Sequence, residues 1–415
     1  MAFVQGAGLD VGQKRSVGHV CQTRGYGNAG VNVRVARVSA RRCAVVSMQQ
    51  RAEQDAAQAK KIKVAVLGAT GSVGQRFIEL LGGHPWFDVV ALGASSRSAG
   101  KPYEEACRWK QAVPIPEETR RVVVSDCDAS LEAFKDVKIV FSGLDNEVAG
   151  DIEEAFAKTG KAVFSNAKNH RMDPDVPILI PPVNAAHVEV LPAQIKARNF
   201  NGGFLVTNAN CSTTVMSIGL KPIMEKFGIE KIHVTTMQAI SGAGYPGLPS
   251  MDIIDNVVPY IGSEEEKMES ESKKIYGTIG KDGTFENADF VVSAMCNRVH
   301  VLDGHLEAIS LKLKTPATPE QVIEAIKAYP SVTKQLGLPS APEKDVVYCD
   351  APDRPQTRLD RMLGGGFTVS VGRVRKCTIN DIRLVCLGHN TIVGAAGGSI
   401  INAELCVAKG LISRE

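Results

Sequence analysis

The stretch KIKVAVLGATGSVG at residues 61–74 decides the fold class of this chain. It starts as an apolar run of strand length and passes directly into a turn that contains Gly68, Gly71 and Gly74. Glycines between a first strand and a first helix let the backbone approach a pyrophosphate, which the amino end of the helix then stabilises. Because the spacing differs from the strict G-x-G-x-x-G pattern, a purely structural strand-to-helix turn remains the alternative.

Strands and helices alternate after this turn. We expect helices through 76–81 and at about 148–158, and strands at 61–67, 88–93, 121–124, 137–141, 162–164 and 178–180. The alternation predicts an α/β fold with a doubly wound, Rossmann-type parallel sheet.

The pattern changes after residue 210. A helix is expected at about 212–227, followed by longer strands at 231–239, 298–313, 367–375 and 383–387. Longer strands with fewer helices predict a second, α+β domain with a mixed or antiparallel sheet. We therefore expect a nucleotide-binding domain at 60–207, a catalytic and dimerisation domain at 208–387, and a tail at 388–415 whose helix packs back on the first domain.

The end of the second expected strand favours NADP over NAD. NAD-binding proteins tend to place an acid there for the ribose hydroxyls, whereas this chain has Ser95, Ser96 and Arg97. Hydroxyls and a guanidinium suit a 2′-phosphate; a solvated loop with one arginine is the alternative. The expected cofactor-binding residues of this domain are Gly68, Thr70, Gly71, Ser72, Val73, Ser95, Ser96 and Arg97.

Residues 1–52 differ in composition from the rest of the chain. They contain a single acid, Asp10, and eight lysines and arginines. An Arg-rich, acid-poor leader is typical of an organellar transit peptide, although a disordered tail or a misassigned start codon would look similar.

Bulk composition excludes several other classes of protein. The net charge of +3 over 415 residues predicts no nucleic-acid partner, and no apolar run reaches transmembrane length, so no membrane partner is expected. The ten cysteines form no CxxC pair, which predicts neither a metal site nor a disulfide framework.

The stretch TNANCSTT at 207–214 is the strongest chemical signal. It places Cys211 at the junction of the two expected domains, just before a helix. A helix N-terminus stabilises a thiolate, and its free amides can hold an oxyanion. A nucleophilic cysteine needs a proton partner, and His305 suits this role because it follows Asp303-Gly304 in a bend between strand segments.

Several motifs together resemble one family. They are GATG at 68–71, NANC at 208–211, MQAISGAG at 237–244, RVHVLDGH at 298–305, and Asn390 followed by the glycine-rich 394–398. From about residue 61 to the C-terminus the chain resembles aspartate-semialdehyde dehydrogenase, in the branch typical of archaea and fungi. The resemblance implies a glyceraldehyde-3-phosphate-dehydrogenase-like fold and a homodimer or homotetramer.

The resemblance also implies roles for individual residues. Cys211 would attack the acyl carbon, His305 would shuttle the proton as acid and base, and Gln238 would orient the intermediate. Arg298 would bind the substrate carboxylate, Glu264 its ammonium, and Lys267, Arg171 and Asn210 its phosphate. Gly242 and Asn390 would contact the nicotinamide half of NADP.

The implied reaction is the NADPH-dependent reductive dephosphorylation of L-4-aspartyl phosphate to L-aspartate 4-semialdehyde and phosphate, in lysine, threonine and methionine biosynthesis. The leader then suggests a chloroplast address, with the mitochondrion or cytoplasm as alternatives. A malonyl-CoA or succinyl-CoA reductase, an N-acetylglutamyl-phosphate reductase and a non-catalytic NADP-binding sensor remain open at this point.

Overall fold

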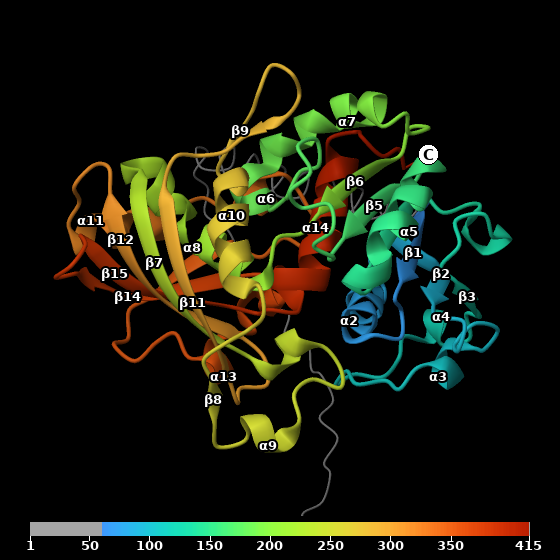
Figure 1. The fold of residues 1–415 in the computed structure, drawn as a ribbon, viewed down its shortest axis with the longest axis horizontal. Coiled ribbons are helices and arrows are strands. Elements are labelled where there is room, and N and C mark those ends of the chain that lie inside the picture. The colour runs from blue at the N-terminus through green and yellow to red at the C-terminus, as the bar shows by residue number, and fades with distance from the viewer. Residues whose placement is uncertain (1–59, 415) are drawn as a thin grey trace, which may run out of the picture. The chain divides into compact units, whose positions relative to one another are not determined.

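The computed structural model describes residues 60–414, so the expected leader lies outside the described residues. Two β-sheets organise this part of the chain (Figure 1). The first sheet is entirely parallel, in the order β3-β2-β1-β4-β5-β6. Its strands are β1 (Ile62–Leu67), β2 (Phe87–Ala94), β3 (Val124–Asp126), β4 (Ile139–Ser142), β5 (Ala162–Ser165) and β6 (Phe204–Thr207).

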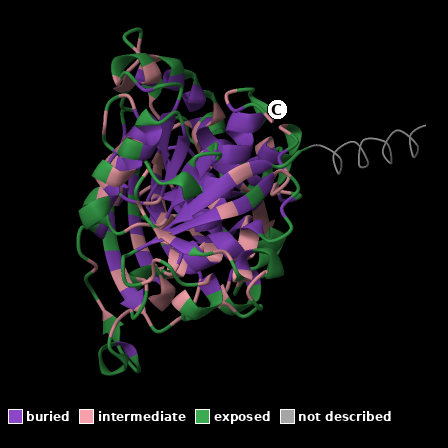
Figure 2. Ribbon diagram, turned by 90° about the vertical axis from the view of Figure 1, so that its right-hand side faces the viewer, coloured by how far each residue is buried: buried purple, intermediate pink, exposed green. Residues whose placement is uncertain are grey.

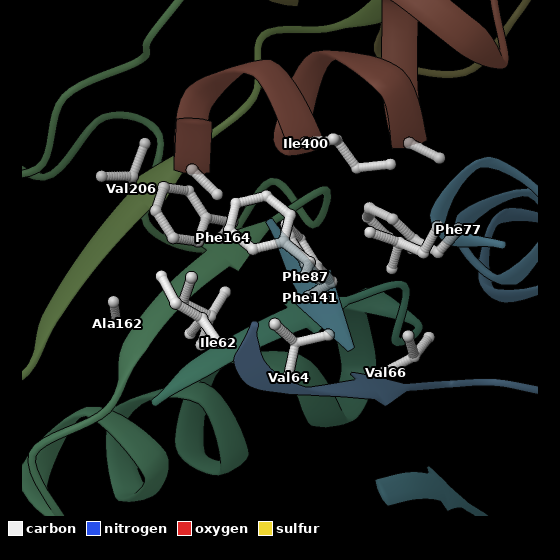
Figure 3. Packing of buried hydrophobic residues seen from close by; sticks show 14 of the residues in the cluster. Ile62, Val64, Val66, Phe77, Phe87, Phe141, Ala162, Phe164, Val206 and Ile400 are labelled. Atoms are coloured by element: carbon white, nitrogen blue, oxygen red, sulfur yellow. The ribbon is translucent and has the colours of Figure 1, made fainter. Parts of the chain in front are cut away.

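Helices cover both faces of this sheet, as a doubly wound fold requires. Alternate residues of β1 serve the two faces: Val64 and Val66 belong to the cluster under α2 (Ser72–Leu81) and α14 (Gly397–Ala408), whereas Ala65 and Leu67 belong to the cluster under α5 (Asn146–Lys158). Figure 3 shows Phe77 of α2 and Ile400 of α14 beside the strand residues of the first cluster. The C-terminal helix is therefore part of the core of the N-terminal sheet.

The second sheet is mixed, in the order β13-β14-β15-β12-β7-β11-β8. Its strands are β7 (Ile229–Gln238), β8 (Val257–Val258), β11 (Val291–Val299), β12 (His305–Leu313), β13 (Val346–Cys349), β14 (Val369–Lys376) and β15 (Ile382–Gly388). A separate hairpin consists of β9 (Thr278–Ile279) and β10 (Phe285–Glu286).

Three longer helices pack against one face of the second sheet and form its core. They are α8 (Cys211–Phe227), α10 (Glu264–Ile275) and α11 (Pro319–Ala328). On the other face, Val291 and Met295 of β11 are exposed. Buried residues concentrate in the strands, and exposed residues lie mainly in peripheral helices and loops (Figure 2).

Short helices make up the rest of the helical structure. None of the helices between residues 60 and 414 has the length and apolar character needed to cross a bilayer. The short α-helices are α3 (Tyr103–Ala106), α4 (Glu117–Arg120), α6 (Pro181–Asn184), α7 (Leu191–Ala197), α9 (Ser250–Ile253), α12 (Val332–Gln335) and α13 (Thr357–Asp360).

The fold class is as predicted, but three strand predictions were wrong. The strand expected at 121–124 begins only at Val124, because the preceding residues close the turn after α4. Residues 178–180 form only an isolated bridge, Ile178 to Thr207. Prolines at 177, 181 and 182 supply no N–H for a strand ladder, and β6, which was not predicted, takes the edge position.

The third correction concerns 298–313, expected as continuous strand structure with a bend. It is two strands, β11 and β12, which both pair with β7. The first of them starts seven residues earlier than expected, at Val291.

Candidate active site

A cavity of about 470 Å³ runs between the N-terminus of α2 and the N-terminus of α8. Ten of the residues expected to bind or react line it: Gly71, Ser72, Val73, Arg171, Asn210, Cys211, Gly242, Glu264, Lys267 and Asn390. The remaining catalytic and substrate candidates, Gln238, Arg298 and His305, lie buried directly behind this wall.

Cys211 is the first residue of α8, and its side chain is partly accessible. The preceding residue, Asn210, caps the helix: its Oδ1 accepts from the amides of Ser212 at 3.0 Å and Thr213 at 3.2 Å. The amide of Ser212 also hydrogen-bonds to Cys211 and lowers the pKa of its thiol.

The three buried candidates form one row across the second sheet. Arg298 of β11 pairs with Gln238 of β7, and His305 opens β12 next to Leu306, which pairs with Met237. All three side chains lie on the face covered by the helices. His305 Nε2 is 3.1 Å from Cys211 Sγ, so the row ends at Cys211.

Burial and the surrounding positive charges act in opposite directions on the ionisation of Cys211. Burial raises the pKa of Cys211 to about 12, the carboxylate of Glu264 adds to this, and Arg298 and Arg171 oppose it. Burial lowers the pKa of His305 to about 3, assisted by the positive charge of Arg298 and by His389. Burial therefore favours the neutral form of both groups.

Charged residues of α10 face Cys211 across the cavity. Glu264 accepts from Asn210 Nδ2 at 2.7 Å and from Lys267 Nζ at 2.8 Å. Although burial favours its neutral form, the charge of Lys267 and these hydrogen bonds hold the pKa of Glu264 below its usual value. The site thus offers a carboxylate and an ammonium group at one wall.

Two further residues of α10 contact residues that line the cavity, and they were not predicted. Glu271 accepts from Arg171 Nη1 at 2.9 Å and from the amide of Asn210 at 2.6 Å. Lys274 donates to the carbonyls of Arg171, Asp173 and Val176 at 2.6 to 2.7 Å. Helical spacing could have revealed both residues, since 264, 267, 271 and 274 fall on one face.

The glycine-rich loop has the features of an anion site. Gly68 has a φ of +68°, and a Cβ there would lie 2.4 Å from the carbonyl oxygen of Gly143. Gly71 caps α2 without a side-chain hydrogen bond, so no side chain competes for the first amides of the helix. In contrast to α8, this N-terminus is free to bind phosphate.

The other residues expected to bind the cofactor lie in the turn itself, directly after β2, and at the far end of the cavity. Gly68 and Thr70 form the turn itself without lining the cavity, and Ser95, Ser96 and Arg97 are exposed immediately after β2. At the far end, a Cβ on Gly242 would lie 2.8 Å from Arg298 Nη1 and 3.2 Å from His305 Cε1. Asn390 donates to Ser241 Oγ at 2.8 Å. The cleft therefore fits an extended dinucleotide with one end near Cys211.

Within residues 60–414, no group of three or more histidine, cysteine, aspartate or glutamate side chains could hold a metal ion.

The chain matches two sequence models of known families. Residues 63–191 match "Semialdehyde dehydrogenase, NAD binding domain", and residues 220–393 match "Semialdehyde dehydrogenase, dimerisation domain".

Individual proteins are similar over almost their whole length. The aspartate-semialdehyde dehydrogenase of Schizosaccharomyces pombe is 50% identical over 355 residues, 84% of this chain and 99% of the relative. That of the archaeon Methanothermobacter thermautotrophicus is 48% identical over 346 residues, 83% and 98% of the two chains. The crystal structure of the Candida albicans enzyme with NADP is 48% identical, has a TM-score of 0.79, and matches 85% of this chain and 100% of that one.

Proposed function

The chain belongs to the aspartate-semialdehyde dehydrogenase family, close to its fungal and archaeal members, and we propose that it carries out this family's reaction through a thioester on Cys211. It has aspartate-semialdehyde dehydrogenase activity (EC 1.2.1.11), uses NADP, and acts in the biosynthesis of aspartate-family amino acids. This decides against the acyl-CoA reductases, the acetylglutamyl-phosphate reductase and the sensor.

The observation that carries the mechanism is the 3.1 Å contact between Cys211 Sγ and His305 Nε2 at the wall of a polar cavity. Cys211 attacks the acyl carbon of L-4-aspartyl phosphate, and phosphate leaves. NADPH, when bound, supplies the hydride that reduces the thioester. His305 shuttles the proton as acid and base, and Gln238 orients the intermediate.

The charges around Cys211 support a particular placement of the substrate. Arg298 binds the α-carboxylate, since a guanidinium suits a carboxylate. Glu264 binds the α-ammonium. Lys267, Arg171 and Asn210 surround the phosphate. In the free protein Lys267 and Arg171 are paired with Glu264 and Glu271, so phosphate binding draws on cations that are already positioned.

The placement of the cofactor follows from the N-terminus of α2, whose first amides are not capped by a side chain. The pyrophosphate lies at Gly71, Ser72 and Val73, with Gly68 and Thr70 shaping the turn. Ser95, Ser96 and Arg97 receive the 2′-phosphate. Gly242 and Asn390 contact the nicotinamide half.

We also propose the division into domains, the oligomeric state and the contact between subunits. Residues 60–207 and 208–387 are the nucleotide-binding and catalytic domains, with 388–415 returning to the first. The match to a dimerisation domain supports a homodimer, and a homotetramer remains an alternative. We assign its contact to the open face of the second sheet, where Val291 and Met295 are exposed. The molar mass in solution, measured by light scattering, distinguishes monomer, dimer and tetramer.

The composition of residues 1–52 supports a plastid address. Fusing residues 1–59 to a fluorescent protein in plastid-bearing cells tests it: fluorescence in plastids supports the address, whereas mitochondrial or cytoplasmic fluorescence rejects it.

The thioester can be tested in one turnover. With aspartate semialdehyde and NADP but no phosphate, the protein should form about one equivalent of NADPH per site and carry an aspartyl adduct on the peptide containing Cys211, visible by mass spectrometry. A Cys211→Ala variant should form neither. An adduct on another residue, or sustained turnover without phosphate, would reject the mechanism.

A further inference from the structure

Arg171 lies in a segment that contains no helix or strand. Between β5 and α6, residues 166–180 form turns, bends and the isolated bridge at Ile178. A ladder of backbone hydrogen bonds therefore does not fix the backbone of Arg171 relative to Cys211. Buried backbone carbonyls in such a segment need other donors, and the position of the segment depends on which donors they find.

Lys274 of α10 supplies three of these donors with a single group. Its Nζ donates to the carbonyl oxygens of Arg171 at 2.7 Å, of Asp173 at 2.6 Å and of Val176 at 2.6 Å. An ammonium group has three N–H donors, so all of them are used on this segment. Because Lys274 is only 3% exposed, bulk water cannot replace it.

The group is charged in spite of its burial. Burial lowers the pKa of Lys274 to about 8. Asp173, Asp175 and Glu271 raise it, and Arg198 at the end of α7 opposes them. At pH 7 the side chain is therefore an ammonium, which is the form that can serve three carbonyls at once.

The hairpin after α10 contacts the same segment. The amide of Phe285 in β10 donates to the carbonyl of Pro174 at 3.1 Å. The ring centre of Phe285 lies 5.0 Å from Lys274 Nζ, a distance that suits a cation–π contact. Four successive anchors, the carbonyls of residues 171, 173, 174 and 176, therefore join this segment to α10 and its hairpin.

The side chain of Arg171 is fixed by the same helix. Glu271, one turn before Lys274, accepts from Arg171 Nη1 at 2.9 Å and from the amide of Asn210 at 2.6 Å. Met268 and Ile275 of α10 share a hydrophobic core with α8, the helix that begins at Cys211. Both ends of Arg171 are therefore tied to the elements that carry Cys211.

From these contacts we propose that Lys274 is a positioning residue for phosphate. By fixing the backbone of residues 171–176 on α10, it keeps the guanidinium of Arg171 at a set distance from Cys211. Lys274 does not line the cavity, so it acts through Arg171 and not by touching the substrate. The proposal rests on the proposed function and adds a residue on which the binding of phosphate depends.

The reverse reaction separates the step that uses phosphate from the steps that do not. With aspartate semialdehyde and NADP alone, the first turnover forms NADPH and the thioester, and phosphate is needed only to release the acyl group. Methionine in Lys274→Met keeps a long side chain but has no donor. We expect the KM for phosphate to rise about tenfold or more, because a displaced Arg171 no longer meets the phosphate oxygens. The rate and yield of the first turnover and the KM for NADP should not change.

Lys273→Met is the matched control. Lys273 is the neighbouring lysine on α10, is partly exposed and does not line the cavity, so its loss should leave the KM for phosphate unchanged. An unchanged KM for phosphate in Lys274→Met would overturn the proposal. Equal losses in the first turnover and in the phosphate step would also overturn it, since a general loss of structure has that effect.

Two further variants test the route through Arg171. Lys274→Gln keeps two N–H donors on a shorter side chain, so it should raise the KM for phosphate less than Lys274→Met; if the Met variant does not fold, an unchanged KM in the Gln variant overturns the proposal. In a chain that already carries Arg171→Gln, the Lys274→Gln change should alter the KM for phosphate by less than about twofold, because its effect is transmitted by Arg171. Fully additive effects would contradict that route.

Failure of the proposed function is distinguishable from failure of this inference. If the unmodified chain formed no NADPH in the first turnover, the thioester mechanism would fall whatever Lys274 does. If the first turnover is normal and the Lys274 variants keep their KM for phosphate, only the positioning role falls.

Discussion

The ionisation of Cys211 depends on its burial and on the groups around it. Burial and the carboxylate of Glu264 raise the pKa of the thiol, whereas Arg298, Arg171 and the amide of Ser212 lower it. Formation of a thiolate therefore needs a proton acceptor beside the sulfur, and His305 Nε2 lies 3.1 Å from it.

The ionisation of Cys211 provides the first prediction. Thiolate absorbance in the ultraviolet, taken as the difference between the unmodified chain and Cys211→Ser, should not appear as the pH rises through 7 to 9, because burial holds the pKa near 12. A difference signal that titrates below pH 7 would show a thiolate–imidazolium pair and contradict this account.

Loss of the sulfur provides the second prediction. Cys211→Ala should reduce turnover by several orders of magnitude, since a missing nucleophile removes the covalent route. NADP binding, followed by fluorescence titration, should be unchanged because the glycine-rich loop is on a different element. Residual activity above about 1% would speak against Cys211 as the nucleophile.

At the scale of elements, α10 links the loop that carries Arg171 to the start of α8. Glu271 accepts from the guanidinium of Arg171 and from the amide of Asn210, and Lys274 donates to the carbonyls of Arg171, Asp173 and Val176. One helix therefore sets the distance between Arg171, proposed to bind the phosphate, and Cys211.

Glu271→Gln should disturb this link selectively. The amide keeps the size of the side chain but cannot offer two carboxylate oxygens to Arg171 and Asn210. A charge-assisted hydrogen bond contributes roughly 1.5–3 kcal/mol, so we expect the KM for phosphate in the reverse reaction to rise about tenfold or more. The KM for NADP should not change. Glu266→Gln, an exposed position on the same helix, is the matched control; an equal effect there would refute a specific role.

Most elements could be predicted because their apolar pattern is continuous. The run at 62–67 is buried almost throughout, and such a run predicts a central parallel strand. Residues 178–180 show a similar apolar pattern, but their neighbouring prolines decide against a strand. The tail at 388–415 contains the expected helix, α14, but a π-helical turn at Ile392–Ala396 precedes it.

Site residues that lie in sequence motifs could be predicted, whereas those placed only by tertiary packing could not. Cys211, Gln238, Arg298 and His305 lie in recognisable motifs. Glu271 and Lys274 lie in a charged stretch that looks like a solvated helix face, and only the contact with residues 171–176 reveals that they are buried.

At the scale of the whole molecule, buried neutral histidines make stability depend on pH. Burial lowers the pKa of His305 to about 3 and of His389 to about 4, below the ordinary value of 6.5. Between these values the unfolded chain binds more protons than the folded one, so stability is full above about pH 6.5 and falls as the pH decreases.

Acidification should therefore weaken the fold measurably. From pH 7 to pH 5 each of these two histidines should cost roughly 2 kcal/mol in the free energy of unfolding. Denaturant unfolding at both pH values should show this loss, and His305→Gln should show a smaller one. An identical pH dependence in the variant would mean that His305 is not buried in its neutral form.

The central claim, a thioester on Cys211 that is resolved by phosphate, is tested most directly by NADPH formation from aspartate semialdehyde and NADP. The full chain is assayed with phosphate, with CoA in its place, and with neither. We predict sustained NADPH formation only with phosphate. Sustained formation with CoA alone, or at the same rate with neither acceptor, would contradict the account.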